Sequence, residues 1–166
     1  MKKLRILPLS FILILCSLSL GLADEKVAVD LVEYVNQGIL NIGELETVAL
    51  EKYSAVIGEN YTSDEIVYNA LKEDVIPLYK RFYEGLRLIS PKTEEVIKLH
   101  QIYVRGAASI NEGFRIKMLG LESQDDSVVI MANKKIEAGS EDVIEWKRQL
   151  QELCKAHGVG TKESKE

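Results

Sequence analysis

The chain has 166 residues, with 21 basic and 26 acidic side chains, a formal net charge of −5 and two cysteines. This length fits one domain, and a domain of this size buries enough surface to fold without a disulfide or a structural metal. The acidic balance disfavours nucleic acid and anionic lipid as partners, because binding phosphates requires a basic surface. The composition therefore argues against a nucleic-acid-binding domain, and we expect an unknown protein partner instead.

The first 23 residues have the three parts of a secretory signal peptide. Residues 1–5 are basic, residues 6–20 are largely apolar, and residues 21–23 place small side chains before Asp24. The apolar stretch is shorter than the roughly 20 residues that a membrane-spanning helix requires. We interpret residues 1–23 as a cleaved signal peptide, which predicts a bacterial protein exported to the periplasm or extracellular space, with no stable membrane insertion after cleavage.

Two alternatives for this segment stay open. The first is an uncleaved anchor. The second is a lipid on Cys16, although Leu15 stands where a bacterial lipobox has a small residue. With the segment removed, Cys154 is the one cysteine left, so no internal disulfide is possible. We expect its thiol to be buried and reduced, and a cross-link between two chains is the alternative.

Apolar residues recur at three- and four-residue spacings along four stretches of the chain. Capping and turn signals separate these stretches near residues 58–65, 90–91 and 123–126. Short breaks between helices of similar length indicate antiparallel neighbours. The predicted fold is therefore all-α, an antiparallel up-down-up-down four-helix bundle over residues 24–158 with a disordered tail at 159–166; its helices are expected at about 24–57, 63–89, 91–120 and 125–157.

Pro77 lies inside the second predicted helix. Its ring removes the N–H that would bond to the Glu73 carbonyl, and it falls opposite the centre of the apolar face. We expect Pro77 to bend the helix at a solvent-facing position.

No motif for catalysis, haem attachment or a di-iron centre is present. The chain lacks Cys-x-x-Cys-His, Glu-x-x-His, His-Glu-x-x-His and Gly-x-Ser-x-Gly. Cys154 and His157 offer two ligands one turn apart, whereas a zinc site needs four. We therefore expect no enzymatic activity, no cofactor and no bound metal.

Glu46 is the most unusual polar residue, because it falls on the apolar arc of the first predicted helix. Counting residues along each helix at a constant rise places Glu46 at the same height along the bundle as Val75, Ser109 and Ile136, close to several glycines. One interpretation is that Glu46 forms the floor of a small pocket and is a proton-sensitive group. The alternative is that its side chain reaches the solvent at the edge of the bundle, and that the glycines only allow the helices to pack closely.

The same count places His100 near Trp146, where the aromatic rings either hold a ligand or form the core edge. The candidate ligand-binding residues are Glu46, Tyr53, Gly106, Gly113, His100 and Trp146. The leading hypothesis is a non-catalytic cell-envelope protein that acts by protein–protein interaction, as a monomer or weak homodimer. The alternative is a small-ligand or metal-binding bundle with an interior pocket near Glu46.

The signal-peptide interpretation predicts that the mature protein begins at Asp24. Intact-mass measurement of the exported protein checks this, because cleavage elsewhere changes the mass by whole residues. A species that retains Met1, or one that begins with a lipid-modified Cys16, would contradict the prediction.

Overall fold

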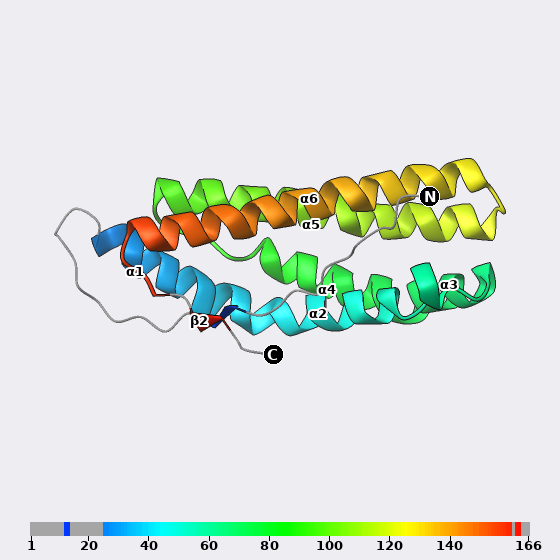
Figure 1. The fold of residues 1–166 in the computed structure, drawn as a ribbon, viewed down its shortest axis with the longest axis horizontal. Helices are drawn as coiled ribbons and strands as arrows, with labels where there is room; N and C mark the ends of the chain where they lie inside the picture. The colour runs from blue at the N-terminus through cyan, green and yellow to red at the C-terminus, as the bar shows by residue number, and fades with distance from the viewer. Residues whose placement is uncertain (1–11, 14–24, 161, 164–166) are drawn as a thin grey trace.

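The structure is a computed structural model that describes residues 12–13, 25–160 and 162–163 (Figure 1). The predicted signal peptide at 1–23 lies outside the described residues except for Ile12–Leu13, and residues 161 and 164–166 of the predicted tail also lie outside them. None of the helices in the described part combines the length and the apolar character that crossing a bilayer requires.

The protein is all-helical between residues 25 and 160, as the apolar spacing predicts. Outside this range the two-residue strands β1 (Ile12–Leu13) and β2 (Lys162–Glu163) pair antiparallel. The helical segments in chain order are α1 (Glu25–Glu33), the π-helical η1 (Tyr34–Ile39), α2 (Leu40–Ser54), the 3₁₀ turn η2 (Gly58–Asn60), α3 (Asp64–Ala70), the π-helical η3 (Leu71–Val75), α4 (Ile76–Leu86), α5 (Glu94–Glu122) and α6 (Asp126–Ala156).

The first and second predicted helices each contain a π-helical segment. Helical backbone angles at the junctions show that α1, η1 and α2 continue as one rod, as do α3, η3 and α4. Pro77 is exposed at the start of α4, directly after η3. A π-helical turn accommodates the backbone carbonyl that a proline leaves without its usual donor, and helical backbone angles continue from η3 into α4; the bend expected at Pro77 stays a prediction.

The four predicted helices begin one to three residues later in the structure, at Glu25, Asp64, Glu94 and Asp126, and the first two end three residues early, at Ser54 and Leu86. α3 begins at Asp64 because the Ser63 side chain caps it by accepting the Ile66 N–H at 3.3 Å. α5 begins at Glu94, three residues after the predicted start, with Thr93 at the N-cap.

The later start of α5 has a cause far away in the sequence. Oδ2 of the buried Asp30 in α1 accepts bonds from the N–H groups of Lys92 at 2.9 Å and Thr93 at 2.7 Å, and from the Thr93 hydroxyl at 2.7 Å. Because Asp30 holds the backbone of Lys92 and Thr93 and engages the Thr93 hydroxyl, these two residues stay outside the helix and Thr93 caps it without a side-chain bond. A contact between α1 and the loop therefore sets the beginning of α5.

Glycines bring α5 and α6 into backbone contact. A Cβ atom added at Gly139 would lie 2.6 Å from the carbonyl oxygen of Gly106 and 2.9 Å from the Ile110 nitrogen. One added at Gly113 would lie 2.5 Å from the Ile136 side chain. Paired residues follow in reversed order along the two helices, which lie side by side in Figure 1. The glycines thus allow α5 and α6 to approach each other closely, at a cost of about 1 kcal/mol each in helix propensity.

Aromatic side chains form the middle of the core, where α2 packs on α4 and α4 packs on α5. At the end of the chain Cys154 is fully buried, as expected. Val159, which the sequence placed in the tail, is also buried in the core, and its N–H donates to the Cys154 carbonyl at 2.8 Å. The fully buried aromatic residues are Tyr53, Tyr79, Phe82, Tyr103 and Phe114.

We predict that Gly139→Ala lowers stability by about 2 kcal/mol, because overpacking against the α5 backbone outweighs the roughly 1 kcal/mol that alanine adds in helix propensity. Urea unfolding checks this, with Ala138→Ser on the exposed side of the same turn as the control. A Gly139→Ala protein as stable as the parent would show that α5 and α6 are further apart than described.

Candidate functional site

The carboxyl group of Glu46 lies inside the protein, with no exposed surface. It projects from α2 and accepts bonds from two phenols: the Tyr103 hydroxyl of α5 donates to Oε2 at 2.5 Å, and the Tyr79 hydroxyl of α4 donates to Oε1 at 3.4 Å. We call these three residues the Glu46 centre. It joins three helical elements through one acidic group.

Burial dominates the protonation of the Glu46 centre. Loss of hydration raises the pKa of Glu46 to about 7, while the Tyr103 bond, the charge of Lys147 and the Tyr79 bond act in the opposite direction. The pKa values of Tyr79 and Tyr103 are raised, first by burial and then by the neighbouring carboxylate. Glu46 therefore exchanges a proton near neutral pH, while both phenols stay protonated and remain donors.

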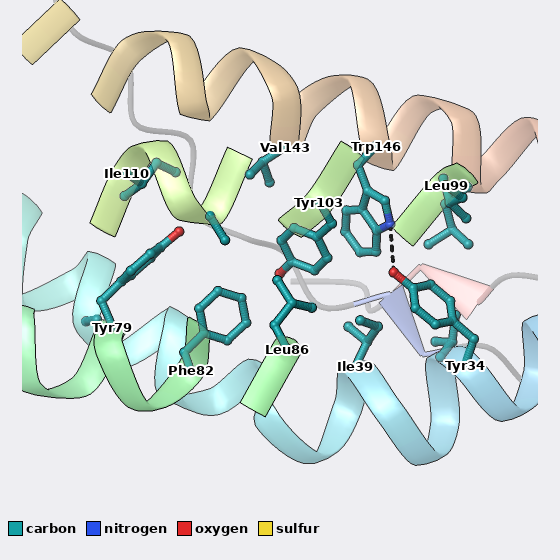
Figure 2. Packing of buried hydrophobic residues seen from close by; sticks show 14 of the residues in the cluster. Tyr34, Ile39, Tyr79, Phe82, Leu86, Leu99, Tyr103, Ile110, Val143 and Trp146 are labelled. Atoms are coloured by element: carbon teal, nitrogen blue, oxygen red, sulfur yellow. Dashed lines mark hydrogen bonds between the residues drawn. The ribbon is translucent and has the colours of Figure 1, made fainter. Parts of the chain in front are cut away.

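Aromatic contacts extend the centre toward η1 and α6. The ring of Tyr103 stacks on Trp146 with centroids 4.0 Å apart. The indole Nε1 of Trp146 donates to the Tyr34 hydroxyl at 3.2 Å, the dashed line in Figure 2. His100 Nδ1 lies 3.3 Å from the same oxygen, and burial lowers the pKa of His100. The structure thus brings His100 and Trp146 together, through a tyrosine that the sequence did not single out.

Tyr53 belongs to a different polar pair. Its hydroxyl accepts a bond from Lys117 Nζ at 2.8 Å, and Lys117 is only 8% exposed. Burial lowers the pKa of Lys117 to about 8, against the opposing charge of Asp64. Phe114 contacts the ring of Tyr53 on one side and that of Tyr79 on the other. The sequence analysis did not identify Lys117. Its three-residue spacing from Phe114, which places it on the apolar face of the helix, is the feature that could have identified it.

The count at constant rise placed the neighbours of Glu46 one to two helical turns away from the residues that reach it. Val75 and Ser109 were expected beside it, whereas Tyr79 and Tyr103 reach its carboxyl. The π-helical segment η3 lies between the 58–62 loop and Tyr79 and shifts the register of the second rod, and a count at constant rise does not include such a shift.

Gly106 and Gly113 face α6 and fill the α5–α6 contact. Three surface pockets, of about 540, 380 and 370 Å³, are lined by described residues, and Glu46 lines none of these three. Within the described ranges no three His, Cys, Asp or Glu side chains come close enough to hold a metal ion. The chemistry that the Glu46 centre supports on this geometry is the uptake and release of one proton.

No protein-family model matches the chain, and neither a curated protein nor a solved structure shows significant similarity to it.

We predict that Glu46→Gln removes a pH dependence of stability. The folded protein holds this proton up to a pKa of about 7, whereas the unfolded chain releases it near 4.5, so stability falls by about 3 kcal/mol as the pH rises between these values. Glutamine imitates the protonated acid and does not titrate. The variant should therefore be more stable than the parent at pH 8 and similar to it at pH 4.

Urea midpoints measured from pH 4 to pH 8 decide this. Glu44→Gln, an exposed change on the same helix, is the matched control and should leave the slope in place. A parent and a Glu46→Gln variant with the same pH profile would place the carboxyl in contact with water.

Proposed function

We propose that the protein is an exported, non-catalytic protein of the bacterial cell envelope that acts by binding another protein, as a monomer or weak homodimer. The basic, apolar and small-residue parts of the first 23 residues support export. The acidic balance supports a protein partner over nucleic acid.

We also propose the finer topology, an antiparallel up-down-up-down four-helix bundle. Its four rods are residues 25–54, residues 64–86, α5 and α6. The reversed order of the α5–α6 contacts and the packing of α2 on α4 and α4 on α5 support this arrangement.

The observation that carries the functional proposal is that the polar groups of the core bind one another. Glu46 accepts hydrogen bonds from the hydroxyls of Tyr79 and Tyr103, and Lys117 donates a hydrogen bond to Tyr53. A ligand site needs convergent polar groups that face an open space, and here these groups already have partners. The surface, by contrast, carries pockets and exposed large apolar side chains, which are features of protein-binding sites.

One observation favours the second candidate, a small-ligand or metal-binding protein that uses the interior near Glu46. A buried carboxyl with a pKa of about 7 is a feature that binding and catalytic sites share. A ligand there would have to displace at least one of the two phenols from the carboxyl.

Native mass spectrometry of the protein purified from its own cells separates the two candidates. The proposal predicts the polypeptide alone or in a stoichiometric complex with another protein. A small molecule or metal bound one to one, present with Glu44→Gln and lost with Glu46→Gln, would contradict the proposal and establish the interior site.

A further inference from the structure

Buried aromatic side chains form a row through the core (Figure 2). The row runs from Tyr34 through Trp146, Tyr103 and Phe82 to Tyr79. The rings of Tyr103 and Trp146 are stacked, with centroids 4.0 Å apart and planes 20° apart, whereas those of Tyr103 and Phe82 are 5.7 Å apart and tilted. Phenols and indoles give up one electron far more readily than phenylalanine does. The stacked pair therefore joins two oxidisable groups in direct contact.

The buried phenols differ in where their protons can go. A phenol that loses one electron becomes a strong acid, so it is oxidised most easily where a base already holds its hydroxyl. Tyr103 donates to Oε2 of Glu46 at 2.5 Å, a length typical of a strong, charge-assisted hydrogen bond. Tyr79 donates to the same carboxyl at the longer distance of 3.4 Å. Tyr53 is the opposite case, because the ammonium group of Lys117 donates to its oxygen.

Trp146 is placed to pass an electron outward from Tyr103. Its side chain reaches the surface and is 4% exposed, whereas Tyr103 has no exposed surface. The indole Nε1 donates to the Tyr34 hydroxyl at 3.2 Å. A phenol oxygen is a weak base, so the indole keeps its N–H proton when it loses an electron. An oxidant at the surface thus meets the indole first, and the phenol with its base lies directly behind it.

We propose that Glu46, Tyr103 and Trp146 form a one-electron oxidation site that captures an oxidising equivalent from an outer-sphere one-electron oxidant at the protein surface. The oxidant takes one electron from Trp146 and is reduced by one electron. Tyr103 then gives one electron to the indole radical cation and its hydroxyl proton to Oε2 of Glu46, so the phenolic O–H bond breaks and a carboxyl O–H bond forms. Trp146 is restored, and the products are a neutral Tyr103 radical and a protonated Glu46. This activity is separate from the proposed binding of a protein partner.

The charge of Glu46 controls this step, because only the carboxylate accepts the proton. The titratable groups that face the carboxyl are Tyr79 of α4, Tyr103 of α5 and Lys147 of α6. Burial raises the pKa of Glu46 to about 7, while both phenols stay protonated. The accepting form is therefore present above this value and lost below it, so Tyr103 should be oxidised faster at pH 8 than at pH 6.

Laser-flash oxidation of the purified protein tests the proposal, with photogenerated ruthenium(III) tris(bipyridine) as the outer-sphere oxidant. Transient absorption follows the indole radical, which is assigned directly because Trp146 is the only tryptophan of the chain. Electron paramagnetic resonance of rapidly frozen samples detects the tyrosyl radical. The indole radical should decay as the tyrosyl radical forms, and faster at pH 8 than at pH 6.

Two variants separate the proton acceptor from the electron donor. Glu46→Gln keeps an acceptor for the Tyr103 hydrogen bond but cannot take the proton. It should slow the decay of the indole radical about a hundredfold at pH 8, as the loss of a positioned proton acceptor typically does, and remove the pH dependence. Tyr103→Phe should leave the Trp146 radical long-lived. Because Glu46→Gln should be more stable than the parent at pH 8, a slower decay in that variant does not reflect unfolding.

Matched controls are Tyr53→Phe, at a buried phenol that faces an ammonium group, Tyr61→Phe, at a phenol that is 51% exposed and donates to Asp64, and Glu44→Gln, at an exposed carboxylate of α2. All three should leave the decay of the indole radical unchanged. Equal decay rates in the parent and in Glu46→Gln at pH 8 would overturn the proposal. So would a tyrosyl radical that persists in Tyr103→Phe and disappears in Tyr61→Phe.

Discussion

The burial of one carboxyl group between two phenols is the constraint on which the rest of the interior depends. Glu46 comes from α2, and its partners Tyr79 and Tyr103 come from α4 and α5. A buried carboxyl without donors costs several kcal/mol, so these helices have to meet at this level and in this rotation. A buried polar network whose members all have partners fixes one arrangement of the core.

The same constraint links the α5–α6 contact to the aromatic core. Tyr103 can stack on Trp146 only if the two helices lie close together, and the backbone contact of Gly106 with Gly139 provides that approach. Trp146 in turn binds Tyr34 of the first rod. With its polar groups committed to one another, the core supports packing and proton exchange, which is why the proposed binding function lies at the surface.

Periodicity and capping signals predicted the four helical stretches, because these depend on residues close together in the chain. The start of α5 could not be predicted, since Asp30, some sixty residues earlier, sets it. Glu46 stood out from its place on the apolar arc, but its partners Tyr79 and Tyr103 lie four and six residues from the positions that a count at constant rise gives, and η3 shifts the register of one of the two helices. Lys117 was missed because a lone lysine is usually solvated, and only its Tyr53 partner explains its burial.

The most direct test of this central constraint is the titration of the Glu46 carboxyl itself. In protein labelled with ¹³C at glutamate side-chain carboxyls, the Glu46 signal is the one that disappears in Glu46→Gln. Its chemical shift should change with a midpoint near pH 7, because burial raises the pKa to about 7. A midpoint near 4.5, the ordinary glutamate value, would show that the carboxyl is hydrated and that the interior is not organised around it.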